Sequence, residues 1–184
     1  LHLMPEILLA LGVLSLLLVG VFRGVNAEPA ISWSLLALLV VVGILIVVRV
    51  SENVVGFSEL LIFDSYGRFM KILVLLGAVF TLLISSTYRR IENLMQYEYP
   101  ILLGFATLGM LLMISANDLM SLYLAVELQS LSLYILAAFN RNSERSSEAG
   151  LKYFILGALS SGVLLYGCSF IYGAVGSTSF FVIA

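Results

Sequence analysis

A carboxylic acid near the middle of a long apolar stretch is the residue of this sequence best placed to do chemistry. Glu127 stands within LYLAVELQSLSLYIL, residues 122–136, whose flanks are apolar enough to lie in lipid. A charged side chain at the centre of a membrane helix costs about 2.5–3.5 kcal/mol on insertion scales, so its presence indicates a function or a buried partner. It is about nine residues, or ~13 Å, from either end of its segment, too far for a short side chain to reach the membrane surface.

Helical spacing surrounds Glu127 with hydroxyl and amide groups. Residues three, four and seven positions apart share one face of a helix, and around Glu127 they include Tyr123, Ser130 and Tyr134. An adjoining stripe adds Gln129. We therefore expect this wide polar face to lie inside a helix bundle, where hydroxyl groups and water can hydrogen-bond the acid in either protonation state.

Two interpretations of Glu127 follow from this placement. A buried carboxyl group whose cationic partner approaches and withdraws takes up and releases protons, which is the physical requirement for a proton relay. Alternatively, a neutral glutamic acid joins helices through hydrogen bonds, each worth about 0.6–2 kcal/mol. Glutamine would join helices at a smaller insertion cost, and Gln129 is already close by, so we favour the relay.

Lys152 is the second candidate for the relay. It lies about four residues into the next apolar segment, where a long side chain can equally serve as an anchor that reaches the membrane surface. The spacing does not distinguish these roles. We do not expect a direct ion pair with Glu127, because the two residues lie at different depths on consecutive antiparallel helices. Water or the hydroxyl groups of Ser160 and Ser161 could bridge them.

The composition places the chain in a membrane and excludes several kinds of site. Of its 184 residues, 61% are hydrophobic and 11% are charged, with a mean hydropathy of +1.12, whereas soluble domains average about 25% charged residues. The single Cys168 and the single His2 exclude a disulfide within the chain and argue against a Cys/His metal site, haem or an iron–sulfur cluster. A net charge of −2 gives no sign of a nucleic-acid surface.

Six apolar segments are long enough to cross a membrane as helices, for which about 20 residues suffice. We therefore predict an all-α fold, a polytopic membrane helix bundle. The joint SANDLM is so short that the helices on either side of it must be antiparallel neighbours, and Asp118 can cap the second of them. Pro5 and Pro100 are expected to open helices and Pro29 to lie in a loop. The predicted spans are residues 5–22, 31–50, 67–88, 99–116, 118–139 and 148–173.

The segments between the spans carry fewer signals. Residues 51–66 alternate polar and apolar side chains, which indicates an interfacial segment or a short strand. Lys71 is shallow in its span and stands close to Arg68, so we interpret it as a surface anchor. The distribution of Lys and Arg near the span ends places the loop NRNSERSSE in the cytoplasm and the N-terminus outside.

Two blocks of the sequence, VELQSLSLYIL and EAGLKYFILGA, carry a family resemblance. Together with their surroundings they are similar to subunit N of NADH-quinone oxidoreductase, respiratory complex I, an antiporter-like membrane subunit. The resemblance is strong over residues 97–173 and looser over 1–96. In related antiporter-like subunits the acid is present but the residues flanking it differ from ELQSLSLY.

This resemblance implies a part in coupling quinone reduction to proton translocation. Glu127 matches the glutamate of the family's fifth helix, which belongs to the proton path, and Lys152 matches the lysine of its sixth helix. The family's chain is longer, with fourteen spans and two inverted five-helix repeats. We therefore expect an N-terminal fragment. Residues 1–96 would be a three-helix segment with its connection at 51–66, and residues 97–184 the first three helices of the first repeat, left incomplete.

The resemblance also implies partners and a location. Other membrane subunits of complex I, the lipid bilayer and protons would be the partners, and NADH, FMN, iron–sulfur clusters and quinone would be bound by other subunits, with no cofactor in this chain. The location would be a bacterial inner membrane, with a mitochondrial inner membrane as the alternative. A cation/proton antiporter subunit and a non-catalytic membrane scaffold remain as alternative functions.

Overall fold

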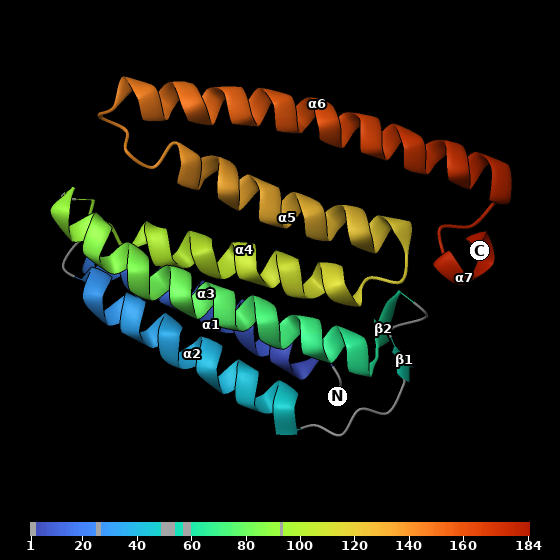
Figure 1. Ribbon diagram of the computed structural model, residues 1–184, viewed down its shortest axis with the longest axis horizontal. Coiled ribbons are helices and arrows are strands. Elements are labelled where there is room, and N and C mark those ends of the chain that lie inside the picture. Colours follow the sequence, from blue (N-terminus) through green and yellow to red (C-terminus); the bar gives the residue numbers. More distant parts are fainter. Residues whose placement is uncertain (1–2, 25–26, 49–53, 57–59, 93) are drawn as a thin grey trace.

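The computed structural model describes residues 3–24, 27–48, 54–56, 60–92 and 94–184. Six helices in these ranges are long and apolar enough to cross a membrane, which confirms the all-α membrane bundle expected from the sequence. They lie roughly along one direction (Figure 1). Their bounds are α1 Met4–Arg23, α2 Glu28–Val48, α3 Ser65–Ile91, α4 Glu98–Ser115, α5 Leu119–Ala137 and α6 Glu144–Val175.

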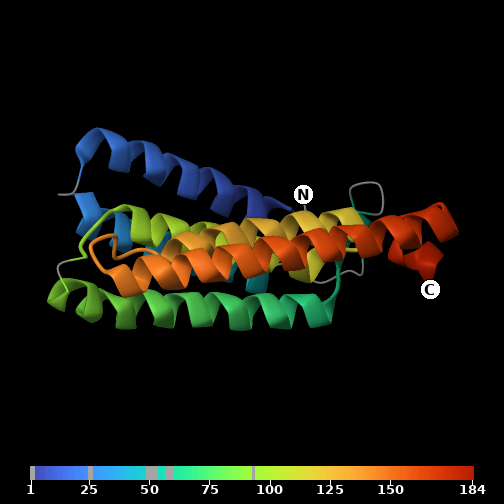
Figure 2. The ribbon, with the colours of Figure 1, turned by 90° about the horizontal axis from the view of Figure 1, so that it is seen from above.

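Helix α4 is the centre of the bundle. It packs against α1, α2, α3 and α5, and α1 and α3 lie on opposite sides of the layer that holds α4, α5 and α6 (Figure 2). Leucine and valine side chains fill the space between these helices, and Leu9, Leu35 and Leu111 are fully buried. Helix α6 packs on α5 at the edge of the bundle, so most of its side chains are exposed.

Glycine allows α4 to approach α5 closely. A Cβ atom added at Gly109 would lie 2.7 Å from the backbone nitrogen of Gln129 and 2.9 Å from the carbonyl oxygen of Ala125. Because both neighbours are backbone atoms of α5, the two helices touch along their main chains at this level, as small residues permit in membrane bundles. This contact fixes the position of the α5 segment that carries Glu127.

Helix termini follow the local chemistry of their residues. Pro5 and Pro100 lie in the first turns of α1 and α4, as predicted, whereas the loop position predicted for Pro29 is wrong, because α2 begins at Glu28. Proline fits a first helical turn, where its missing N–H would have no helical acceptor. The Asp118 cap is confirmed: its carboxylate accepts from the backbone N–H groups of Met120 at 2.8 Å and Ser121 at 3.3 Å.

The connection at 51–66 contains a small antiparallel hairpin. Strands β1 (Val54–Gly56) and β2 (Leu61–Phe63) pair with Val54 opposite Phe63, which agrees with the short strand considered for this segment; residues 51–53 and 57–59 lie outside the described part. Leu61 also forms a bridge with Ala116. Beyond α6, a short helix α7 (Phe180–Ile183) follows, and the preceding Ser179 bridges to Asp118. The hairpin and α7 therefore both meet the α4–α5 turn.

Candidate functional site

Glu127 lies at the middle of α5 and faces α6. Its α-carbon is ~12 Å from one end of α5 and ~15 Å from the other, at ~1.5 Å per residue. The side chain is partly buried, and its Oε1 accepts a hydrogen bond from the hydroxyl group of Ser161 on α6. The hydroxyl oxygens of Ser161 and Tyr123 lie 3.2 Å apart. The structure thus gathers an acid and two hydroxyl groups at one level of the α5–α6 interface.

These three groups form an ordered hydrogen-bond chain. A serine hydroxyl has one proton to donate and can also accept. When Ser161 donates to the Glu127 carboxylate, its oxygen is free to accept from the phenol of Tyr123, which lies one helical turn away from Glu127 on α5. The order reverses when the acid is protonated and itself donates. The cluster can therefore satisfy either form of the carboxyl group without changing its partners.

Tyr134 lies two turns further along the same face of α5. It is buried, and its ring meets those of Tyr153 and Phe154 edge-on, with centroids 4.8 Å and 5.7 Å apart. Its hydroxyl group lies over Gly157, where an added Cβ would approach it to 1.9 Å. A glycine is therefore required at position 157 for the phenol to lie between α5 and α6.

The described contacts of the other residues proposed for the relay do not include Glu127. Gln129 packs against Gly109 of α4, on the opposite side of α5 from α6, while Ser130 is half-buried and Ser160 is exposed. Lys152 is also exposed and pairs with Glu148 one turn earlier, at 2.6 Å. It lies ~13 Å along α6 from Ser161. The structure does not bring Lys152 to Glu127.

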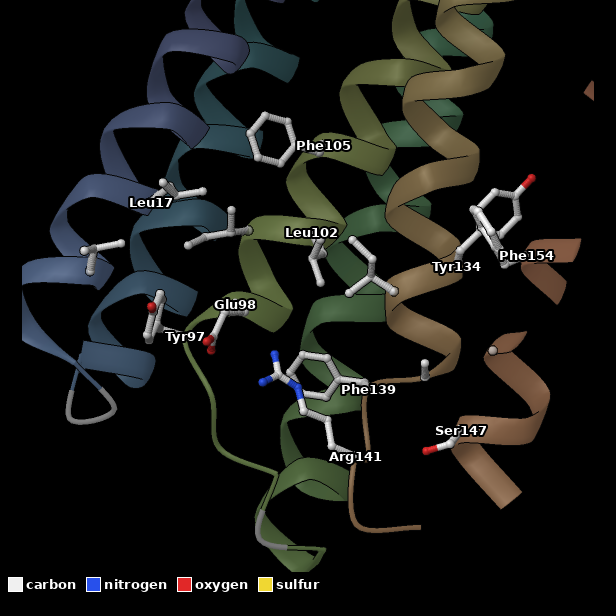
Figure 3. A pocket seen from close by; sticks show the side chains of 15 residues that line it. Leu17, Tyr97, Glu98, Leu102, Phe105, Tyr134, Phe139, Arg141, Ser147 and Phe154 are labelled. Atoms are coloured by element: carbon white, nitrogen blue, oxygen red, sulfur yellow. The ribbon is translucent and has the colours of Figure 1, made fainter. Parts of the chain in front are cut away.

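A cavity of about 710 Å³ lies beside Tyr134. Figure 3 shows Glu98 and Arg141 at one end of it and Tyr134 with Phe154 at its side. The remaining lining is largely apolar and comes from α1, α4, α5 and α6. Sequence reasoning did not find this cavity, because it forms only when four helices assemble.

Two buried ion pairs hold α3 to its neighbours, and sequence reasoning missed both. Lys71 pairs with Glu6 of α1 at 2.5 Å, and Arg89 pairs with Glu28 of α2. All four side chains are almost fully buried. The interpretation of Lys71 as a surface anchor is therefore wrong: its ammonium group is directed into the bundle, because an acid on α1 is there to receive it.

Comparison with known proteins places these helices in a family. A family model for the transmembrane region of NADH:quinone oxidoreductase and Mrp antiporters matches residues 116–184. NADH-quinone oxidoreductase subunit N 1 of Rhizobium meliloti is 49% identical over 98% of this chain, and subunit N of Rhodospirillum rubrum is 50% identical over 96%. The chain belongs to the NADH-quinone oxidoreductase subunit N family. It spans 38% and 37% of the length of these two relatives.

Solved structures share the fold of this subunit N family chain. A chain of respiratory complex I from Thermus thermophilus, solved with bound aureothin, superposes with a TM-score of 0.79 at 29% identity, over 96% of this chain and 38% of that one. A chain of an archaeal membrane-bound sulfane sulfur reductase reaches a TM-score of 0.70 at 19% identity and covers 94% of this chain and 38% of its own. The second likeness concerns the fold alone. The segment matched by the NADH:quinone oxidoreductase/Mrp antiporter model includes α5 and α6, and with them Glu127, Ser161 and Tyr123.

Proposed function

We propose that this chain is part of the membrane arm of a proton-pumping NADH-quinone oxidoreductase and carries one section of its proton path. The observation that supports this role is the carboxyl group of Glu127 at the middle of α5, hydrogen-bonded to Ser161 and, through it, linked to Tyr123. Ionisable residues within membrane spans are rare, and proton relays are among the functions that they mark. The subunit N family gives the chemical context.

In this proposal Glu127 is the group that takes up and releases the proton. Ser161 and Tyr123 hold it in place, because hydroxyl groups exchange donor and acceptor roles as the carboxyl group changes its charge. Tyr134 extends the polar face toward the cavity of about 710 Å³ beside Glu98 and Arg141. Lys152 remains the second relay residue, which water would have to connect over ~13 Å of helix. Gln129 and Ser160 face away and are left out of the path.

The remaining features of the assembly follow from the family. We propose that NADH oxidation and quinone reduction occur in other subunits, that the neighbours of this chain are membrane subunits of the same complex, and that residues 97–184 begin its first antiporter-like repeat. The relatives named above are bacterial, which favours a bacterial inner membrane over a mitochondrial one.

Replacement of Glu127 by Gln in the full-length protein tests this function. Glutamine keeps the shape and the hydrogen bond from Ser161 but cannot bind or release a proton at this position, so proton translocation by the assembled complex should fall severalfold while assembly persists. Assembly is measured by native gel electrophoresis, and translocation by the pH change that NADH oxidation causes in membrane vesicles. Glu144→Gln, a change of an exposed acid in the first turn of α6, is the matched control. Unchanged proton translocation in the Glu127→Gln variant would favour the alternative that this chain is a non-catalytic membrane scaffold.

A cation/proton antiporter subunit is the second candidate, because the matching family model covers Mrp antiporters as well. The same vesicles separate the two functions. An antiporter would exchange protons for Na⁺ without NADH, whereas the proposed function requires NADH oxidation and gives no sodium-driven proton flux.

A further inference from the structure

A small cavity between the ends of α2 and α3 has the features of an anion site at the membrane surface. Its volume is about 160 Å³. The first turns of α2 and the last turns of α3 form its walls, so it opens between two membrane-spanning helices close to their ends. The lining includes Glu28, Ser32, Trp33, Leu36, Leu83, Arg89 and Arg90.

Arg89 lines this cavity with hydrogen-bonding capacity that the described residues do not use. Its side chain is 1% exposed. One nitrogen, Nη1, donates to Glu28, and the guanidinium group lies over the ring of Tyr99, 4.5 Å from its centroid. Among the described residues, Nε and Nη2 have no acceptor. Buried donors without acceptors are costly, so these two need an acceptor from a ligand, from water or from a residue outside the described part of the chain.

The charge around the cavity selects an anion. Arg90 adds a second, exposed guanidinium group, whereas the single acid, Glu28, already accepts from Arg89 and from Ser32 at 2.9 Å. One positive charge therefore remains in excess. The donor pair Nε and Nη2 is the edge of the guanidinium fork that binds phosphate oxygens in bidentate fashion.

The outer wall of the cavity indicates the source of that anion. Trp33 and Leu83 are 68% and 46% exposed on the outer surface of α2 and α3. Tryptophan is typical of the membrane–water boundary, where its ring lies among headgroups. The volume equals that of about five water molecules, each taking ~30 Å³, which accommodates a phosphate group. A headgroup phosphate here would leave an acyl chain beside Leu36 and Leu83.

We propose that this cavity binds the phosphate group of an anionic phospholipid through Arg89 and Arg90. Basic pockets between transmembrane helices are a known form of anionic-lipid recognition. The lipid satisfies the two buried donors of Arg89, and its acyl chain covers the groove between α2 and α3. The site is separate from the α5–α6 interface and does not depend on the proposed proton path.

Photo-crosslinking in vesicles tests this site. The full-length protein is reconstituted with phosphatidylglycerol that carries a diazirine in its acyl chain, and labelled peptides are mapped. We expect labelling of the peptides that contain Trp33 and Leu83. Arg89→Lys keeps a cation beside Glu28 but removes the fork, and should lower this labelling about tenfold. Arg90→Gln, on the exposed surface, should lower it about threefold.

Matched controls decide between the lipid and other occupants. Arg23→Gln removes an exposed arginine at the end of α1 and should leave labelling unchanged. A zwitterionic phosphatidylcholine probe should label these peptides severalfold less. Equal labelling in wild type, Arg89→Lys and Arg90→Gln would overturn the proposal and leave water in the cavity. Loss of labelling when millimolar inorganic phosphate is added would overturn the lipid assignment in favour of a free anion.

Discussion

Replacing Gly109 with Ala should destabilise the bundle by separating α4 from α5. The new Cβ would lie 2.7 Å from the backbone nitrogen of Gln129, and unstrained contacts begin near 3.4 Å. The difference, 3.4 minus 2.7, requires a movement of about 0.7 Å, which a rigid helix backbone must make as a whole. Overpacking of this kind costs about 1–3 kcal/mol.

A second glycine provides the control for this prediction. At Gly43 an added Cβ would meet only the Leu75 side chain, at 3.8 Å, which is an ordinary contact. Both replacements gain the helix preference of alanine over glycine, about 0.5–1 kcal/mol, so this term cancels in the comparison. We expect Gly109→Ala to be less stable than Gly43→Ala by about 1–3 kcal/mol.

The measurement is unfolding of the purified protein in mixed micelles with increasing SDS, followed by circular dichroism at 222 nm. Gly109→Ala should unfold at a lower SDS fraction than wild type, and Gly43→Ala at the same or a higher one. Equal midpoints for the two variants would refute the direct backbone contact between α4 and α5 at Gly109.

Three further predictions use the same assay. Lys71→Met leaves Glu6 buried without a partner and should lower the free energy of unfolding by about 3–5 kcal/mol. The double variant Lys71→Met/Glu6→Gln should recover most of this loss. If the single and the double variant lose the same stability, the two residues are not coupled. Asp118→Ala removes the α5 cap and should cost about 0.5–2 kcal/mol, whereas Asp118→Asn, which keeps an acceptor, should cost less; equal costs would exclude capping. Lys152→Gln should change stability by less than about 0.5 kcal/mol, because its pair with Glu148 is solvent-exposed; a larger loss would indicate a second partner.

Features set by neighbouring residues could be predicted from the sequence. The six spans follow from apolar length alone, and the Asp118 cap follows from an acid placed directly before a helix. The strand at 61–63 also agrees with the sequence, which indicates an interfacial segment or a short strand for residues 51–66. The loop position predicted for Pro29 is wrong because α2 begins at Glu28, before the predicted start of the span at residue 31. An acid followed by proline suits a first helical turn.

Contacts between distant segments could not be predicted in the same way. Glu6 and Lys71 are 65 residues apart, and Glu28 and Arg89 are 61 apart. Each of the four residues lies near the end of its own helix, where a charged side chain ordinarily reaches the membrane surface. Only the packing of α3 on α2 and α4, which brings Lys71 within reach of Glu6 on α1, shows that these side chains turn inward.

The rotation of α5 explains which members of the polar face meet Glu127. Tyr123 is four residues away and shares its side of the helix, whereas Gln129, two residues on, is turned by ~200° and contacts α4. Ser161 could be named as a candidate from its hydroxyl group alone. Its choice over the adjacent Ser160 depends on the rotation of α6, which no local pattern in the sequence defines.

The buried ionisable groups differ in their partners: some face an opposite charge, and one faces hydroxyl groups. Lys71 and Arg89 face carboxylates, and the attraction within each ion pair offsets the cost of burying its two charges. Adding a proton to either pair, or removing one, would break the ion pair and leave one charge buried alone. Glu127 instead faces hydroxyl groups, which stabilise the charged and the neutral acid alike. Gain or loss of a proton at Glu127 therefore leaves the packing of α5 on α6 intact. By this argument α1, α2 and α3 form a clamped support, and the proton exchange that we propose for Glu127 would take place at the α5–α6 interface.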